Sequence, residues 1–525
     1  MSIAITSPAL ARDEASIYQQ LSTLDSPVFV VRDGGGIAVT TDAGTARRAQ
    51  VLAAVPALPP ESLGDPDFRA HHEVRHAYQA GAMANGIASV RLVTALAGAG
   101  FLASFGAAGV VPAKIDDALA AIRHAVGGKP FSCNLIHSPS EPALERAIVD
   151  ACLRNEVRCV EASAFIDLTP QVVKYRLAGL GRDRDGRIVT RNKVIAKVSR
   201  AEVAERFLRP APAGAVRELL AAGEITAEQA ELAAAVPMAD DITAEADSGG
   251  HTDRRPLPVL VPSLIALRDR VWRESAYPRP VRIGAAGGIG TPAAAAAAFA
   301  LGASYVVTGS INQASLEADQ SGAAKRLLAQ AGSADTEMAP SSDMFELGVD
   351  VQVLKRGTMF ASRARRLYDA YRAFDGIGDI PAADRADLEQ RIFQRSFDEV
   401  WTDCVRYFRE RDPEQIDRAE GNPKRRMALI FRWYLGRSSG WSMAEDPART
   451  ADYQIWCGPA MGAFNEWVAG TYLAARGHRH VAELATQIMR GAAFTTRVNQ
   501  LRAAGVRLPA ACSTYVPAPL TEVTR

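Results

Sequence analysis

Between residues 77 and 307, short apolar segments that suit β-strands alternate with longer segments whose apolar residues recur at helical spacing. The expected strands cover residues 77–83, 101–105, 131–136, 157–162, 193–198, 238–245, 281–286 and 305–307. The expected helices cover residues 89–97, 114–126, 141–153, 171–177 and 201–207, inserted helices at 213–235, and an alanine-rich stretch from 292. Alternation of this length predicts a parallel sheet covered by helices, and eight repeats predict a closed (β/α)8 TIM barrel.

Two glycine turns follow the last two expected strands. Gly287-Gly288 precedes a residue pair, Thr291-Pro292, that suits a helix N-cap and first turn, and Gly309-Ser310 repeats the arrangement in a shorter form. Glycine lets backbone N–H groups approach a phosphate closely, and a helix N-terminus favours negative charge. Either turn alone is equally well a tight strand-to-helix connection. As a pair after the last strands, they predict a phosphate site on the C-terminal face of a barrel, because a dinucleotide fold would carry its glycine motif in its first unit.

The barrel region is flanked by segments of different character, so three domains are expected: 1–75, 76–332 and 333–525. The first is a small β-containing cap, because residues 27–31 and 37–40 suit a hairpin around a glycine turn. The last is an α-helical subdomain packed on the barrel, with helical segments such as 386–409 and 424–435. It holds five of the six tryptophans. Aromatic residues at helical spacing are more often core than part of a cofactor site, which favours a packed subdomain.

The formal net charge of +1 gives no general attraction to nucleic acid or to a membrane surface, and no charged tail is evident. The first sixteen residues carry charges and no long apolar block, so a secretory signal is not expected. The longest weakly apolar segment, 292–307, is mostly alanine and suits a buried helix and strand better than a membrane span. We therefore expect a cytoplasmic protein without nucleic-acid or membrane partners.

The cysteines and histidines suggest no metal site. The six cysteines are scattered without C-x-x-C spacing, which indicates neither a disulfide scaffold nor a zinc site and favours a reducing compartment. His71, His72 and His76 cluster, but their neighbours supply no convincing set of metal ligands. These histidines are expected on a polar surface helix.

A histidine follows a glycine pair at the end of the sixth expected strand. Gly249 and Gly250 would let the chain pass closely over a flat ligand and then present His251. An imidazole titrates near neutral pH, so it can donate a hydrogen bond to a substrate carbonyl or deliver a proton. The alternative is a loop histidine that faces water.

Other strand ends also carry residues suited to the barrel mouth. Gly81, Ala82 and Met83 offer small residues and open backbone against which a planar ring can lie, and Asn134 and Lys197 would point polar groups at the same mouth. A lysine in a barrel centre requires an anionic partner. A phosphate or an electron-rich ring is the expected partner, and a structural ion pair is the alternative.

Several strings resemble the flavin mononucleotide (FMN) barrel family of nitronate monooxygenases and bacterial enoyl reductases. They are residues 79–83, 245–251, 285–289 and 309–310. More narrowly, further strings resemble the trans-acting enoyl reductases of polyketide and polyunsaturated fatty-acid synthases, the PfaD type. These are residues 134–139, 245–253, 353–360, 422–424, 427–436 and 452–465. The likeness extends from about residue 27 to about residue 493, and the long helical region separates this type from the nitronate monooxygenases.

This resemblance implies a flavin enzyme that passes hydride from NADPH to the β-carbon of an enoyl thioester on an acyl carrier protein. His251 would orient or polarise the thioester carbonyl, with protonation of the α-carbon as a further role. The FMN phosphate would lie against Gly287, Gly288, Gly309 and Ser310, and the ring or ribityl chain against Gly81, Ala82, Met83, Asn134 and Lys197. Gly249, Gly250 and Ile289 are further expected cofactor-binding residues. Gln79-Ala80-Gly81 departs from the glycine doublet that the wider flavin barrels often carry there, so the ring contacts at this strand end are approximate.

The sequence also allows two other functions, and it suggests a carrier protein and a second copy of the chain as partners. A nitronate monooxygenase-type flavin oxidase is the second functional candidate, and a barrel that has lost its cofactor and serves as a scaffold is the third. An acidic carrier protein would suit the basic residues Lys424, Arg425, Arg426, Arg432 and Arg437, although a buried helix with a solvated basic end is slightly favoured. Barrels with large helical additions often pair, so a homodimer is one candidate assembly.

Overall fold

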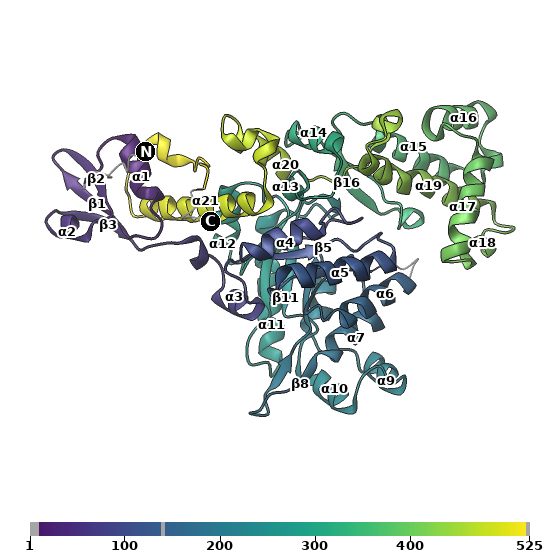
Figure 1. Ribbon diagram of the computed structural model, residues 1–525, viewed down its shortest axis with the longest axis horizontal. Coiled ribbons are helices and arrows are strands. Elements are labelled where there is room, and N and C mark those ends of the chain that lie inside the picture. The colour runs from purple at the N-terminus through teal and green to yellow at the C-terminus, as the bar shows by residue number, and fades with distance from the viewer. Residues whose placement is uncertain (1–9, 138–141, 521–525) are drawn as a thin grey trace.

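In the computed structural model, which describes residues 10–137 and 142–520, eight parallel strands close into a barrel (Figure 1). They are β4 (Tyr78–Ala80), β5 (Leu102–Phe105), β6 (Ser132–Ile136), β7 (Cys159–Ser163), β10 (Lys193–Val198), β11 (Asp241–Glu245), β13 (Arg282–Ala286) and β14 (Val306–Thr308). The last strand pairs with the first, with Val306 opposite Tyr78. The predicted TIM barrel is therefore confirmed, strand for strand.

Helices return the chain between the strands. They are α4 (Val90–Gly98), α5 (Pro112–Val126), α6 (Pro142–Arg154), α7 (Pro170–Ala178), α8 (Ala201–Leu208), α11 (Leu257–Glu274), α12 (Pro292–Ala300) and the short α13 (Ser310–Gln313). Thr291 caps α12 as expected, because its hydroxyl accepts a hydrogen bond from the Ala294 N–H at 3.2 Å. Glu141, the expected start of α6, lies outside the described residues, as do Ser138 and Pro139.

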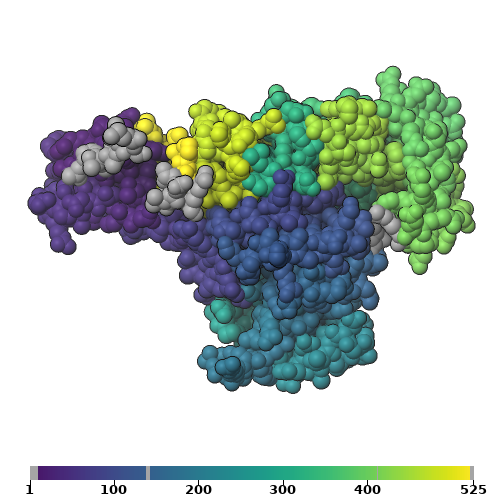
Figure 2. Space-filling view, viewed as in Figure 1, coloured from purple at the N-terminus to yellow at the C-terminus, as the bar shows by residue number. Residues whose placement is uncertain are grey.

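Two small insertions lie before and after β10 and α8. The first, after α7, is a hairpin of β8 (Leu180–Arg182) and β9 (Ile188–Thr190). The second, after α8, holds the predicted inserted helices α9 (Ala213–Ala221) and α10 (Ala227–Leu232) and ends in the turn η2 (Ala233–Ala235). These elements project from the side of the barrel opposite the C-terminal region (Figure 2). They therefore lie away from the strand ends where a site is expected.

The N-terminal cap is a three-stranded antiparallel sheet, in the order β2 (Gly36–Thr40), β1 (Val28–Asp33), β3 (Val51–Val55). The expected hairpin is confirmed, while β3 was not predicted. The helices α1 (Glu14–Ser22) and α2 (Ala43–Arg47) belong to the same part of the chain, and η1 (Pro60–Ser62) and α3 (Pro66–His72) lead to the barrel. The long C-terminal helix α21 (Val481–Ala503) packs against β3, α1 and α12 (Figure 1). The cap is thus attached to the barrel largely through the C-terminal end of the chain.

The region from residue 333 is mainly helical, but it also contributes two strands. Strands β15 (Thr336–Pro340) and β16 (Asp350–Leu354) form a sheet with β12 (Gly250–His251) of the barrel region. The helices are α15 (Phe360–Ala373), α16 (Ala382–Asp387), α17 (Phe397–Arg411), α18 (Glu414–Asp417), α19 (Pro423–Ala444), α20 (Ala460–Val468) and α21, preceded by α14 (Gly322–Ala329). Short turns link them: η3 (Phe345–Leu347), η4 (Ile377–Asp379), η5 (Leu388–Phe393), η6 (Pro447–Asp452), η7 (Tyr472–Ala474), η8 (Arg476–His478) and η9 (Ala510–Ser513). The domain limits at 75 and 332 stay predictions.

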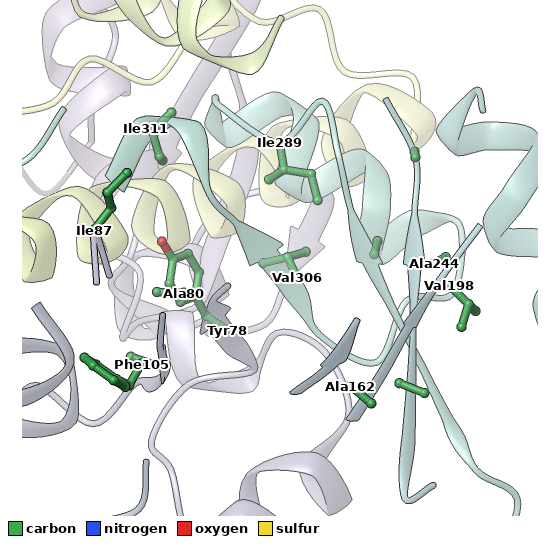
Figure 3. Packing of buried hydrophobic residues seen from close by; sticks show 14 of the residues in the cluster. Tyr78, Ala80, Ile87, Phe105, Ala162, Val198, Ala244, Ile289, Val306 and Ile311 are labelled. Atoms are coloured by element: carbon green, nitrogen blue, oxygen red, sulfur yellow. The ribbon is translucent and has the colours of Figure 1, made fainter. Parts of the chain in front are cut away.

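Buried side chains form one large core that continues from the barrel into the C-terminal region. Val306 in the barrel shares this cluster with Ile289 and Ile311, which follow the two glycine turns (Figure 3). Trp441 lies in the same cluster, and the other C-terminal tryptophans are partly buried against it. The aromatic residues of this region therefore serve mainly as core, as predicted.

The clustered histidines are not on a polar surface helix, so that prediction is wrong for His72 and His76. His72 is 1% exposed, and its Nε2 lies 2.7 Å from Asp241 Oδ2 at the start of β11. Arg282 also pairs with Asp241, with N–O distances of 2.6 and 2.9 Å. A buried carboxylate requires charged or hydrogen-bonding partners, and α3 supplies one of them. Within the described ranges, no helix is both long and apolar enough to cross a membrane.

Candidate active site

A cavity of about 1020 Å³ lies at the C-terminal ends of the barrel strands and extends under the C-terminal helices. Every residue predicted to bind the cofactor or to act in catalysis borders it. These residues are Gly81, Ala82, Met83, Asn134, Lys197, Gly249, Gly250, His251, Gly287, Gly288, Ile289, Gly309 and Ser310. The structure therefore brings all of them to one place, while their individual roles stay predictions. The Ile289 side chain is only 2% exposed and packs mainly into the core.

The two glycine turns leave the barrel side by side, because β13 and β14 are neighbouring strands with Ala286 opposite Val307. Gly287 and Gly288 have φ values of 85° and 72°, in the left-handed region that favours glycine. No atom lies within 4 Å of the position that a Cβ would take on Gly288 or Gly309. The turns thus leave open space in front of exposed backbone, which suits an anionic group such as a phosphate ester.

The segment at 456–460 closes over these turns from the C-terminal region. The Gly458 N–H donates a hydrogen bond to Ser310 Oγ at 3.0 Å, and a Cβ on Gly290 would clash with the Ala460 carbonyl. A Cβ on Gly249 would lie 2.8 Å from the backbone nitrogen of Cys457. Glycine is therefore required where the two parts of the chain touch. Nothing in the sequence predicted this contact.

Gln313, one turn after Ser310 in α13, borders the cavity and was not predicted. Its side chain is 2% exposed, and its Nε2 has no hydrogen-bond partner among the described residues. A buried amide donor without a partner is uncommon in native proteins. Its place beside the open glycine turns makes it a further candidate donor to a bound anionic group. A glutamine in a short helix carries no recognisable signal in a single sequence.

His251 lies on a short strand, where a loop was the simple expectation. It pairs with Val351 of β16, which fixes its backbone. Its Nε2 lies 3.2 Å from Asp343 Oδ1. Burial lowers the pKa of His251, but the Asp343 carboxylate outweighs burial and raises the pKa above its ordinary value. Burial alone would raise the pKa of Asp343, yet the His251 charge lowers it to about 2. Each charge of the pair therefore favours the other, as an imidazolium beside a carboxylate.

Lys197 points into the barrel mouth between two carboxylates. Its Nζ lies 3.1 Å from Glu245 Oε1 and 3.6 Å from Glu161 Oε1. Burial lowers the pKa of Lys197, but the two carboxylates outweigh burial and raise it above the ordinary value. The alternative of an ion pair is thus present in the structure, and the ammonium also borders the cavity. Neither Glu161 nor Glu245 was predicted as a site residue.

Hydrogen bonds to β7 fix the orientation of the Asn134 side chain. Its Nδ2 donates to Ser163 Oγ at 2.8 Å and to the Glu161 carbonyl at 3.1 Å. With both amide hydrogens engaged, Asn134 presents its carbonyl oxygen as an acceptor. Its place at the cavity fits the prediction, and its orientation depends on β7.

Most of the basic residues on α19 have partners within the chain. Arg426 pairs with Asp398 at 3.2 Å, and Arg425 and Arg432 pair with Glu346 at 3.2 and 3.3 Å. This arrangement fits the favoured interpretation of a buried helix with a solvated basic end. Arg437 differs, because it has no ion-pair partner in the part of the chain that the structure describes and it borders the cavity.

Three family models match the chain. The nitronate monooxygenase model matches residues 67–360, which is more than half of the chain. The N-terminal domain of the fatty acid synthase protein PfaD matches residues 6–57, and the inserted helical domain of [acyl-carrier-protein] S-malonyltransferase matches residues 374–453. The last match covers α16 to α19. Of these helices, α17 and α19 line the cavity and, with the segment at 456–460, form what we call the cavity roof.

Curated relatives and a solved structure agree with these models. A component of the polyunsaturated fatty acid synthase of Thraustochytrium sp. is 45% identical over 504 residues, which are 94% of this chain and 33% of that protein. The polyketide biosynthesis protein PksE of Bacillus subtilis is 45% identical over 430 residues, 82% of this chain and 56% of that protein. The chain thus spans a third to just over half of the length of these relatives.

The crystal structure of the enoyl reductase domain of MlnA, from the macrolactin biosynthesis cluster of Bacillus amyloliquefaciens, shares the fold. The TM-score is 0.81 at 37% identity, and the match covers 85% of this chain and 100% of that chain. These matches confirm the resemblance inferred from the sequence.

Proposed function

The chain belongs to the nitronate monooxygenase family, with the MlnA enoyl reductase domain among its relatives, and on that premise we propose that it is an FMN-dependent enoyl reductase. Its reaction would be the reduction, with NADPH, of the α,β double bond of an enoyl thioester on an acyl carrier protein. One observation carries this proposal: the two glycine turns and His251 converge on a single cavity, in a chain that matches the whole MlnA domain.

The residues around the cavity fit FMN. Gly288 and Gly309 leave open space where a phosphate would lie, and Gln313 supplies a buried donor without a partner beside it. Small residues at Gly81, Ala82 and Gly250 leave room for a flat ring at the barrel mouth. When bound there, FMN would supply the hydride carrier between NADPH and the thioester.

His251 would act on the substrate. As an imidazolium held by Asp343, it can donate a hydrogen bond to the thioester carbonyl, which polarises the double bond toward attack at the β-carbon. It can also deliver its proton to the α-carbon as the double bond is reduced. The carboxylate of Asp343 would stabilise the charged form and fix the ring orientation.

The cavity roof supports a thioester with an extended acyl chain. Trp433 and Met443 of α19 and Trp456 of the closing segment line the cavity and present apolar surface. The names of the relatives point to polyunsaturated fatty-acid or polyketide synthesis, in which acyl chains are carried as thioesters. We propose a carrier-protein-bound chain as the substrate on this basis.

The test is a comparison of substrates under anaerobic conditions. Purified protein reconstituted with FMN should oxidise NADPH when a crotonyl or longer enoyl thioester of an acyl carrier protein is present. Formation of the saturated thioester, followed by mass spectrometry, should match the NADPH consumed. NADPH oxidation at the same rate without thioester would contradict the proposal.

The alternative outcomes are distinct. A nitronate monooxygenase would consume oxygen with propionate 3-nitronate or a nitroalkane and need no NADPH. The match of the nitronate monooxygenase model to residues 67–360 is the reason to test this activity. A scaffold without catalysis would stay colourless after incubation with FMN.

A further inference from the structure

Glu161 is a buried carboxylate next to the cavity. Its own side chain does not line the cavity, but several of the residues that it contacts do. It lies in the middle of β7 and is 1% exposed. It does not border the cavity itself, whereas its neighbours Ala82, Asn134 and Lys197 do. Burial of a charged carboxylate is unfavourable unless several groups compensate it, so its contacts indicate what it does.

The contacts of Glu161 reach both a strand that is not its neighbour in the barrel, β4, and one that is, β10. Gln79 Nε2, on β4, donates to Glu161 Oε2 at 2.8 Å. The Ala82 backbone N–H donates to both carboxylate oxygens, at 3.2 and 3.3 Å. On the other side, Lys197 Nζ on β10 lies 3.6 Å away. One side chain from β7 therefore holds the loop after β4, across the barrel interior, and the ammonium from the neighbouring strand β10.

A simple structural ion pair would not need this arrangement. Lys197 already has a closer carboxylate in Glu245, at 3.1 Å. The second carboxylate adds a contact to a backbone N–H that borders the cavity, and it leaves two negative charges around one positive charge. Both features act on the ring-binding side of the cavity.

We infer that Glu161 is a positioning residue that holds the Ala82 N–H and the Lys197 ammonium in place beneath the bound flavin ring. The inference rests on the proposed function, because it assumes that FMN lies at this mouth. The carboxylate fixes where the ammonium points and partly neutralises its charge. Glu161 thereby sets both the affinity for the flavin and the stability of its reduced form.

Two substitutions separate these effects. Glu161→Gln keeps the shape and an acceptor for the Ala82 N–H but removes the charge, so that Lys197 has only Glu245 beside it. Reduced flavin carries more negative charge than oxidised flavin and should then be favoured about tenfold, which is a shift of about +30 mV in a two-electron midpoint potential. Glu161→Asp keeps the charge but withdraws it from the Ala82 N–H, so FMN affinity should fall with a smaller change in potential.

The readouts are the midpoint potential of the bound flavin and the FMN dissociation constant, measured by fluorescence quenching on apoprotein. Glu145→Gln is the matched control, because Glu145 is 3% exposed and pairs with a histidine outside the cavity. It should leave both values unchanged. In a Lys197→Gln background, the ammonium through which Glu161 is proposed to act is absent, so Glu161→Gln should add little further shift.

The outcomes distinguish the inference from the proposed function. If the wild-type protein takes up no flavin, both the proposed function and the inference about Glu161 are contradicted. If it takes up flavin but Glu161→Gln and Glu161→Asp behave like Glu145→Gln, the inference alone is overturned. Loss of thermal stability in the Glu161 variants without a change in potential or affinity would also overturn it, because that result describes a purely structural carboxylate.

Discussion

Asp343 Oδ1 lies 3.2 Å from His251 Nε2, although the two residues are 92 positions apart in the chain. Asp343 follows β15 in the C-terminal region, and His251 belongs to the barrel region. The pair joins only because β12 and β16 form one sheet. The candidate active site is therefore complete only when both regions are present.

The Asp343→Asn variant should be less active at neutral pH. Burial lowers the pKa of His251, whereas the Asp343 carboxylate raises it, so removal of that charge should move this pKa down. Because the imidazolium is the proposed active form, the fall in kcat/KM with rising pH should begin at lower pH in the variant. A pH profile of kcat/KM with a soluble enoyl thioester checks this, and an unchanged descending limb would show that Asp343 does not set the His251 charge.

The His251→Ala variant should keep its flavin but lose the reaction with substrate. His251 borders the cavity from β12 and belongs to neither glycine turn, so FMN binding should change little. Loss of a general acid typically lowers the rate about 10²–10⁴-fold. Stopped-flow reoxidation of reduced enzyme by enoyl thioester measures this step. Reoxidation at the wild-type rate would remove His251 from the mechanism.

The Gly309→Ala variant tests the phosphate cradle. The backbone of Gly309 is not in the left-handed region, and a Cβ there would enter open space, so the folded protein should be as stable as the wild type. The same Cβ would occupy the space expected for the phosphate and weaken FMN binding about tenfold or more.

Gly214→Ala, in α9 of the insertion, is the matched control because its Cβ also meets no atom within 4 Å. It should leave FMN affinity unchanged. Riboflavin, which lacks the phosphate, gives the second comparison. Gly309→Ala should affect riboflavin binding much less than FMN binding, and an equal loss for both ligands would place the phosphate elsewhere.

The barrel and the meeting of the glycine turns could be predicted because their signals are local. Alternating apolar segments mark each strand, and consecutive strands of a barrel bring Gly288 and Gly309 together. Asp343 and Glu161 could not be found in this way. Asp343 sits in a polar stretch without a motif, and Glu161 lies in an ordinary buried strand. Their roles arise from pairings between distant parts of the chain, which leave no periodic pattern in a single sequence.

The helical region shows the same limit. Helical spacing predicted α17 and α19, and their aromatic residues do form core. The strands β15 and β16 were missed. They pair with each other, and β16 also pairs with β12 of the barrel region, so their sheet joins distant parts of the chain. Whether the basic residues on α19 are paired or free also depends on partners such as Glu346, which lies far away in the sequence.

The Arg437→Glu variant tests where a carrier protein docks. Arg437 is exposed, borders the cavity and has no ion-pair partner within the described residues, so it is free to meet an acidic partner. Reversal of a charge at a docking rim mainly slows association. We expect a higher KM for carrier-bound enoyl thioester and an unchanged KM for a small thioester mimic. Arg426→Glu, which removes a pair with Asp398, serves as the control, and equal effects on both substrates would argue against docking at Arg437.

The Arg497→Met variant should loosen the N-terminal cap. Arg497 on α21 is completely buried, and burial lowers the pKa of its guanidinium to about 10. It donates hydrogen bonds to the carbonyl oxygens of Leu21, Thr23, Leu24, Ser26 and Pro56. Methionine fills much of the space but removes these five hydrogen bonds, which should lower the free energy of unfolding by about 3 kcal/mol or more. Lysine should not rescue the variant, because an ammonium cannot reproduce the guanidinium fork.

Urea unfolding and limited proteolysis between residues 21 and 60 measure the effect. Arg502→Met, on the exposed side of the same helix, should change neither, and a cap that resists protease equally in both variants would show that Arg497 does not hold it.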